Sequence, residues 1–229
     1  MKLFKNVSLL ATLISLALSA NSVAQTPSAE PASSTQGLST AQPLIDAKIE
    51  LMVKLEKVAF FSADFNQQIF DQEGNSLQQG TGKFSVSKPN LIHWQTLSPD
   101  ESLIVSDGEN LWFYDPFVEQ VSVYTLASAI ANTPILLLSS NDPQLWQDYA
   151  VSKIAKNRYA IVAKGQDSRV KSLTLSFANS EHTPKLIAVE MLDTTGQLSV
   201  IKLLNHGSAP NPALFSFSVP EGVYLDDQR

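Results

Sequence analysis

The most informative absence in this chain of 229 residues is cysteine, of which it has none. Without a thiol, the protein cannot form a disulfide bond, hold zinc through thiolates or use a cysteine nucleophile. It also offers no cysteine to which a lipid anchor could be attached. The composition therefore excludes thiol chemistry and anchoring through a lipidated cysteine.

Histidine is nearly as scarce, and the three histidines, His93, His182 and His206, are far apart in the sequence. None has a carboxylate or a second histidine at the spacing of a metal site. The sequence also has no HExxH, GxSxG or EF-hand pattern. We therefore expect no catalytic site, no metal and no cofactor, and we infer a binding or carrier protein rather than an enzyme.

Basic residues are outnumbered, with 16 Lys and Arg against 22 Asp and Glu. The net charge is −6, and removal of an N-terminal segment with two lysines would change it to −6 − 2 = −8. Such a charge argues against partners made of nucleic acid and against electrostatic adsorption to anionic membranes. Contact with lipid tails remains compatible with it, because the hydrophobic effect does not depend on charge.

Long apolar runs are confined to the N-terminus, where residues 1–24 have the organisation of a secretory signal peptide. Two lysines precede the apolar stretch 7–18, which is too short to span a bilayer comfortably. Ser22-Val23-Ala24 then supplies the small residues of a cleavage site. The sequence predicts cleavage after Ala24 and export of a soluble product, with an uncleaved anchor as the alternative.

Beyond the signal peptide, the composition predicts a tether followed by one domain. Residues 25–42 are rich in Ser, Thr, Ala, Pro and Gln and lack apolar periodicity, as is typical of a disordered segment. Residues 44–58 have the pattern of an amphipathic helix with Pro43 at its start. The apolar face of this helix must pack on something, so we assign residues 43–229 to a single domain.

The rest of the domain consists of short strand patterns separated by turn signals, without the strand–helix alternation of a parallel sheet. Asp107-Gly108 is one such signal, because glycine readily adopts the positive φ of a tight hairpin turn. The expected strands are residues 60–70, 77–87, 91–96, 102–106, 110–114, 120–124, 151–154, 159–163, 170–177, 186–192 and 198–204, with a last edge pairing at Phe217 and Val219. We predict a mainly β (α+β) fold, in which a single curved antiparallel sheet forms an incomplete barrel with an N-terminal helix and short lid helices on its concave side.

The segment from Leu126 to Ser139 differs from the strands around it, and we predict that it forms the lid. Its second half, 135–138, reads Ile-Leu-Leu-Leu and is apolar all round, so it must be buried in protein or against a ligand. The predicted lining of an apolar cavity consists of Ile92, Trp94, Ile104 and Trp112 on the strands and Leu136, Leu137 and Leu138 on the lid. Ordinary core packing explains each of these residues equally well.

Three motifs stand out along the domain. They are Pro89-Asn90 followed by Trp94, Ser106-Asp107-Gly108 followed by Leu111-Trp112-Phe113-Tyr114-Asp115-Pro116, and the closing Asp226-Asp227-Gln228-Arg229. With Asn132-Thr133-Pro134 ahead of the lid, they resemble the LolA family, the periplasmic lipoprotein carriers of Gram-negative bacteria. The resemblance extends from Leu44 to Arg229.

The resemblance implies a periplasmic protein whose unclosed barrel takes the acyl chains of lipoproteins beneath a helical lid. It also implies two partners: the inner-membrane ABC transporter LolCDE, which loads the carrier, and the outer-membrane receptor LolB, which receives the cargo. The receptor shares the fold but is anchored through a lipidated cysteine, so this cysteine-free chain fits the carrier role. We expect a monomer that binds lipoproteins and no nucleic acid.

The chain departs from the family pattern at Lys88. The family usually has an arginine there, to which the role of a latch on backbone carbonyls of the lid is ascribed. Lysine keeps the charge but loses the planar fork of donors. We therefore predict that Lys88 is a lid latch that holds with fewer bonds, the alternative being a solvated charge at the end of a strand.

Two other functions are compatible with an exported chain of this composition. One is a sensor or chaperone of the same fold that binds misplaced lipid or peptide, and the other is a lipid hydrolase. A sensor would usually bring an extra partner domain, and a hydrolase needs a nucleophile beside a base. The sequence shows neither feature, which favours the carrier.

Overall fold

The computed structural model describes residues 46–132, 134–140, 142–165, 170–179 and 183–229. The predicted signal peptide, the predicted tether, Pro43 and His182 lie outside the described residues. Within the part of the chain that is described, no helix is long and apolar enough to cross a bilayer.

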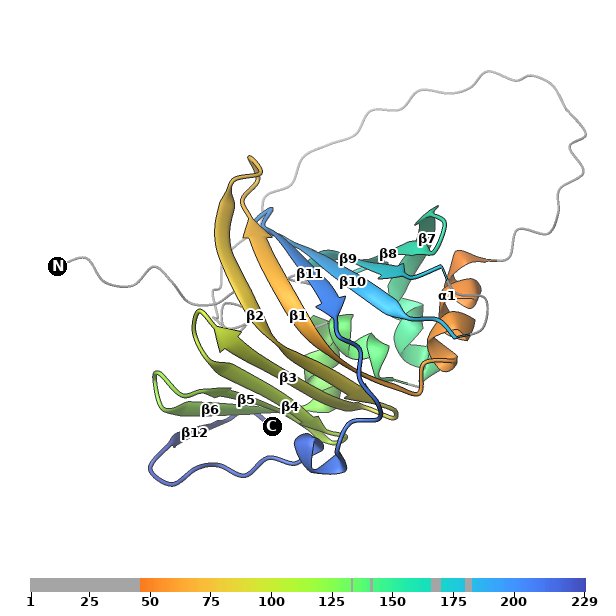
Figure 1. Ribbon diagram of the computed structural model, residues 1–229. Helices are drawn as coiled ribbons and strands as arrows, with labels where there is room; N and C mark the ends of the chain where they lie inside the picture. Colours follow the sequence, from red (N-terminus) through yellow and green to blue (C-terminus); the bar gives the residue numbers. More distant parts are fainter. Residues whose placement is uncertain (1–45, 133, 141, 166–169, 180–182) are drawn as a thin grey trace, which may run out of the picture. The chain divides into compact units, whose positions relative to one another are not determined.

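The described residues form one twelve-stranded sheet accompanied by short helices (Figure 1). The strands are β1 Phe60–Phe70, β2 Ser76–Ser87, β3 Leu91–Ser98, β4 Ser102–Asp107, β5 Asn110–Asp115, β6 Gln120–Thr125, β7 Tyr149–Ala155, β8 Arg158–Ala163, β9 Val170–Phe177, β10 Leu186–Asp193, β11 Leu198–Leu204 and β12 Tyr224–Asp227. The helices are α1 Ala47–Glu56, α2 Leu126–Asn132, η2 Pro134–Leu138, η3 Pro143–Asp148 and η4 Pro212–Phe215. All strands expected up to residue 204 are confirmed, with small shifts at their ends.

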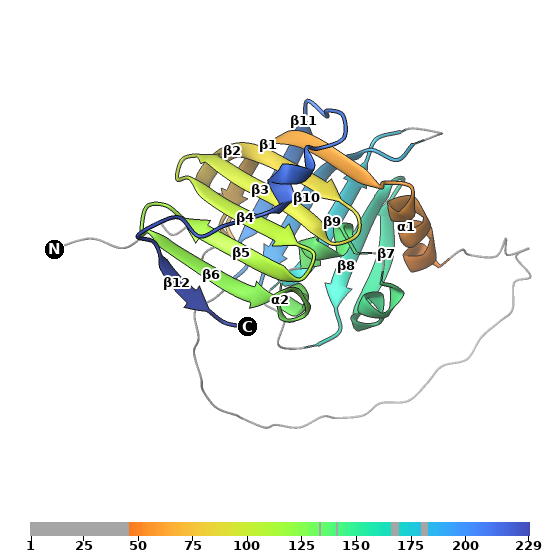
Figure 2. The same ribbon diagram turned by 90° about the horizontal axis from the view of Figure 1, so that it is seen from below.

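The strand order is β12-β6-β5-β4-β3-β2-β1-β11-β10-β9-β8-β7, so β12 and β7 are the two edges of the sheet. Every neighbouring pair is antiparallel except β12 and β6, which are parallel. Figures 1 and 2 show that the sheet curves strongly around α2 and the segment that follows it. The predicted incomplete barrel with helices on its concave side is confirmed.

The register of the strands gives the sheet one apolar and one largely polar face. In β1, buried and more exposed residues alternate along the whole strand, as expected when one face is covered. Directly paired residues share a face, so the pairs Phe84–Trp94 and Trp94–Ile104 place these three side chains together. The same face continues across the sheet through Leu175 and Ile201 and forms the core.

Gly82 allows the aromatic part of this core to form. A Cβ at this position would clash with the Phe65 ring and with the carbonyl oxygen of Gln95. The glycine therefore lets an aromatic ring lie directly against the backbone of β2, which is a recurrent use of glycine within a strand.

The helix near the start of the domain was expected, but the expectation about the last strand is wrong. The first helix begins at Ala47, within the predicted range 44–58, because the Asp46 carboxylate accepts a hydrogen bond from the Lys48 N–H at 2.8 Å and caps the first turn. The last strand is β12 and not a pairing at Phe217 and Val219. Pro220 lacks the N–H that would continue such a pairing, and the chain turns at Gly222, with φ +82°, before it joins β6.

Candidate functional site

The concave face is closed by the segment η2, whose apolar side chains fill the interior. Ile135, Leu136, Leu137 and Leu138 are 8%, 2%, 0% and 3% exposed. Figure 2 shows this part of the chain inside the curve of the sheet, and η2 contacts β9. We call Ile135–Leu138 the plug. The predicted burial of the lid is confirmed, and in this conformation its surroundings are protein side chains.

An aromatic cluster lies on the same face of the sheet. The Trp94 ring is 4.6 Å from that of Phe65 and 4.8 Å from that of Phe84, and Phe84 packs edge-on against Phe61 at 5.0 Å. All four side chains are buried. No hydrogen-bond partner for the Trp94 indole nitrogen is found among the described residues. Apart from this indole N–H, the cluster is an apolar wall.

The structure brings together six of the seven residues predicted to line a cavity. Ile92 pairs with Val86 and shares the concave face with Trp94 and Ile104, and all three are buried, as are the three plug leucines. The register places these strand residues on the face that the helices cover. Whether they touch cargo is not decided by this placement and stays a prediction.

Trp112 is the exception, and its assignment to the concave face is wrong. It pairs with Val105, one residue out of phase with the Ile104–Phe113 pair, so its ring points to the opposite face. There its indole nitrogen donates to the Asp107 carboxylate at 2.8 Å, and its ring packs on Phe217 at 5.6 Å. Trp112 therefore helps to fasten the C-terminal segment to the outside of the sheet.

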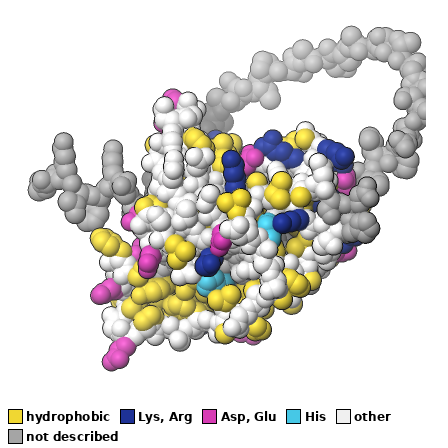
Figure 3. Space-filling view, viewed as in Figure 1, with side chains coloured by type: hydrophobic (Ala, Val, Ile, Leu, Met, Phe, Trp, Pro, Cys, Tyr) yellow, Lys and Arg dark blue, Asp and Glu magenta, His cyan; other side chains and the backbone are white. Residues whose placement is uncertain are grey.

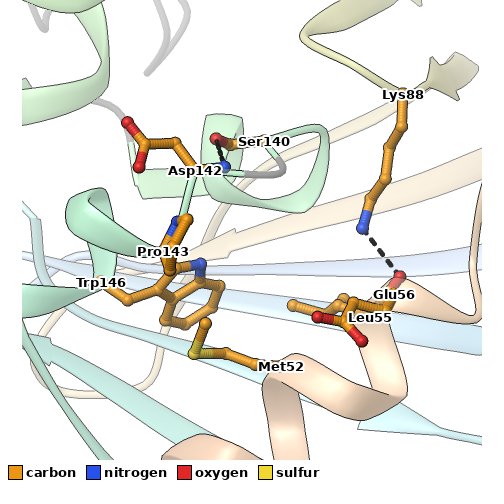
Figure 4. Close-up of a pocket in the computed structure, with 8 residues that line it drawn as sticks. All are labelled: Met52, Leu55, Glu56, Lys88, Ser140, Asp142, Pro143 and Trp146. Atoms are coloured by element: carbon orange, nitrogen blue, oxygen red, sulfur yellow. Dashed lines mark hydrogen bonds between the residues drawn. The ribbon is translucent and has the colours of Figure 1, made fainter.

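A recess of about 280 Å³ opens beside the plug, between the end of α1 and the start of η3 (Figure 4). Its lining residues are Met52, Leu55, Glu56, Lys88, Ser140, Asp142, Pro143 and Trp146. Figure 4 shows the Met52 side chain pointing towards the Trp146 ring across this space. The recess thus combines an apolar wall with one basic and two acidic groups, and it is where the first helix meets the lid segment.

Lys88 lies at this recess and bonds the first helix. Its Nζ donates to the carbonyl oxygen of Leu55 at 2.7 Å, in the last turn of α1 (Figure 4). The same oxygen accepts from the Val58 N–H at 2.9 Å, and the partial negative charge at a helix C-terminus favours a cation beside it. Burial lowers the pKa of the Lys88 ammonium, and the nearby Glu56 carboxylate opposes this shift. The carbonyl that Lys88 reaches therefore belongs to α1, whereas a lid carbonyl was expected.

The lid segment is held by a different contact in the same turn. The Asn90 N–H donates to the Ser139 carbonyl oxygen at 2.9 Å, and the Ser139 hydroxyl donates to the Leu136 carbonyl at 2.9 Å. Asn90 has a φ of +62°, a conformation that asparagine tolerates better than most residues. The turn between β2 and β3 therefore touches both covers of the concave face, α1 through Lys88 and the plug through Asn90.

Sequence reasoning missed the polar attachment of α1 to the sheet. The Glu50 carboxylate accepts hydrogen bonds from Lys153 at 2.7 Å and from the Tyr159 hydroxyl at 2.7 Å. The Lys153 hydrogen bond, followed by that of Tyr159, lowers the pKa of Glu50. Burial and the Glu50 carboxylate together raise the pKa of Tyr159. The partners of Glu50 lie more than a hundred residues away in the sequence and leave no local signal.

The described residues contain no group of three or more His, Asp or Glu side chains that could hold a metal ion. His93 pairs with Val105 and so shares the convex face with Trp112, but it is buried there, and burial lowers its pKa. What the concave side offers chemically is a mainly apolar surface, an apolar segment that covers it and a small recess with charged groups. These are the elements of a binding site for an apolar ligand.

The family model and the curated relatives that match this chain carry the same description. Residues 56–218 match the family model described as outer membrane lipoprotein carrier protein LolA. The outer-membrane lipoprotein carrier protein of Actinobacillus pleuropneumoniae serotype 7 is 42% identical over 181 residues, covering 79% of this chain and 83% of the relative. The protein of the same name from Yersinia enterocolitica serotype O:8 is 38% identical over 194 residues, covering 84% of this chain and 94% of the relative.

Among solved structures, a LolA superfamily protein from Nitrosomonas europaea matches 76% of this chain and 98% of its own with a TM-score of 0.47 at 10% identity.

The residues that match the family model run from the end of α1 to just beyond η4. They include the plug, the turn at Lys88 and the aromatic cluster.

Proposed function

This chain belongs to the LolA family of outer-membrane lipoprotein carrier proteins, and from that membership we propose how it holds its cargo. The protein is a lipoprotein carrier, as its relatives are named, and we propose that it works in the periplasm. We propose that the acyl chains enter the space now filled by the plug and lie against Ile92, Trp94 and Ile104. The N-terminal signal peptide would be removed on export.

The observation that supports this proposal is the burial of the plug against a mainly apolar face. Ligand pockets for small molecules usually measure about 300–1,000 Å³. The recess beside the plug is about 280 Å³, so it is too small for several long acyl chains. Cargo would therefore have to displace the plug, exchanging one set of apolar contacts for another.

Replacement of plug contacts by acyl-chain contacts explains how a carrier can bind apolar cargo and still release it. Burial of acyl carbon is worth about 0.8 kcal/mol per methylene, so three long chains would give a gross gain of tens of kcal/mol. That exceeds the ceiling of about 20 kcal/mol on real affinities. Lost plug contacts and incomplete burial of the chains would keep the net affinity modest, so that transfer needs no nucleotide in the periplasm.

The proposed partners are those of the family: the inner-membrane ABC transporter LolCDE as donor and the outer-membrane receptor LolB as acceptor. A monomer suffices for this cycle, because the concave face, its plug and the recess all come from one chain. The plug also covers the apolar face of the empty carrier, which would promote aggregation if it were exposed to water.

The test is to isolate the protein from the periplasm and to identify by mass spectrometry what accompanies it. The expected result is triacylated lipoproteins, and the purified carrier should bind a triacylated lipopeptide far more tightly than the same peptide without acyl chains. Equal binding of the two peptides would contradict the proposal. Recovery of unacylated peptides alone would instead favour a peptide-binding chaperone of the same fold.

A further inference from the structure

The turn between β5 and β6 presents large apolar side chains to solvent. Phe117 is 90% exposed and Val118 is 58% exposed. Two further exposed residues follow on β12, Tyr224 at 66% and Leu225 at 40%. The parallel register brings these elements together, since Tyr224 pairs with Gln120 and Leu225 with Val121. We call Phe117, Val118, Tyr224 and Leu225 the apolar tip.

The backbone of the apolar tip is fixed by its own hydrogen bonds. The Asp115 carboxylate accepts from the Phe117 N–H at 2.9 Å and from the Val118 N–H at 3.3 Å. The Glu119 carbonyl accepts from the Tyr224 N–H at 2.9 Å, which ties the turn to β12. Phe117 is therefore presented by an ordered turn, so little backbone freedom would be lost when it binds.

The surroundings of the apolar tip are acidic. Residues 110–123 and 216–229 contain Asp115, Glu119, Glu221, Asp226 and Asp227 against a single cation, Arg229, which is paired with Asp227 at 2.6 Å. Figure 3 agrees: the end of the molecule at the lower left, where β5, β6 and β12 lie, carries acidic side chains beside apolar ones and no dark blue groups. A partner surface that fits must therefore be apolar at its centre and basic around it.

We propose that the apolar tip is a docking site for a partner protein at the donor or acceptor membrane, one with an apolar pocket for Phe117 rimmed by Lys and Arg. The proposal rests on the carrier function proposed above. A rigid aromatic side chain in a pocket is the usual anchor of a protein interface, and opposite charges around it would speed encounter. A second copy of this chain fits poorly, because a two-fold contact would bring the acidic rims together. An anionic bilayer would be repelled in the same way.

The test compares Phe117→Ser with Leu77→Ser, a matched control that is 53% exposed on β2, far from the apolar tip in the sheet. Three quantities are measured for the full-length carrier: release of a labelled lipoprotein from spheroplasts, its transfer to outer membranes, and binding of a triacylated lipopeptide in solution. Phe117→Ser should slow release or transfer about tenfold, as loss of an interface anchor does. Lipopeptide binding should not change, and Leu77→Ser should behave as wild type in all three.

A charge reversal, Glu119→Lys with Glu221→Lys, should slow the same step and make that step less sensitive to salt. Normal release and transfer by Phe117→Ser would overturn the docking site. It would also be overturned if the wild-type protein bound vesicles of phosphatidylethanolamine and phosphatidylglycerol through Phe117, because the tip would then be a lipid contact. Failure of the wild-type protein to bind lipopeptide would be a failure of the carrier function itself and is read from the third measurement.

Discussion

At the scale of single residues, Lys88 is the most informative position, because one ammonium group joins the β2–β3 turn to α1. Its hydrogen bond is an additional one to the Leu55 carbonyl, which also accepts from the Val58 N–H at 2.9 Å. An arginine there could reach more than one carbonyl through its fork of donors. The family pattern and this chain thus differ in how many bonds fasten the cover, while the charge is the same.

We predict that Lys88→Met lowers the free energy of unfolding by about 1–2 kcal/mol, because a partly buried carbonyl loses its charged donor. The same change should speed loading with lipopeptide, since α1 lines the recess beside the plug and is then held less firmly. Lys88→Arg should slow loading and release relative to wild type. Urea denaturation and stopped-flow fluorescence with a labelled lipopeptide provide the measurements.

Lys83→Met is the matched control, because its partner Asp64 lies at the surface and such ion pairs contribute little. This control should leave both stability and loading close to wild type. If neither Lys88→Met nor Lys88→Arg changes the rates of loading and release, Lys88 is not a latch. Its hydrogen bond would then contribute to stability alone.

At the scale of elements, the concave face has two covers that are attached differently. The first helix is fastened by polar contacts, through Lys88 at its end and through the Glu50–Tyr159 hydrogen bond nearer its start. The plug is held mainly by burial of its own apolar side chains, with the Asn90–Ser139 hydrogen bond at its end. An apolar ligand competes for apolar contacts, so the plug and not α1 is the element that cargo should displace.

Leu137→Ala tests this assignment, because Leu137 is fully buried in the plug. The substitution should lower the free energy of unfolding by about 2–5 kcal/mol, as is usual for a buried leucine. It should also raise the affinity for a triacylated lipopeptide about tenfold, since less plug contact is lost when the ligand enters. Urea denaturation and equilibrium binding measure the two effects.

Val123→Ala is the control for core damage, because Val123 is fully buried on the opposite face, where it pairs with Trp112. It should lower stability without changing lipopeptide affinity. If Leu137→Ala weakened binding, or if both substitutions changed it equally, the plug would be part of the permanent core.

At the scale of the whole molecule, alternation along the strands predicted most of the architecture. A strand such as β1, with apolar residues at every second position, reveals its buried face directly. The segment Leu111–Tyr114 does not reveal which of its faces lies on the concave side, because it is apolar on both. The assignment of Trp112 to the concave face failed for that reason. The partners of Lys88 and Glu50 were also beyond prediction, since they depend on how distant segments pack.

The central claim is that acyl chains replace the plug inside a sheet that otherwise keeps its shape. Hydrogen–deuterium exchange, with and without a bound triacylated lipopeptide, measures this most directly. The account predicts that amides of residues 135–140 exchange faster in the loaded protein, while those of β1, β2 and β3 remain protected. A loaded protein whose plug amides are as protected as in the empty one would contradict it.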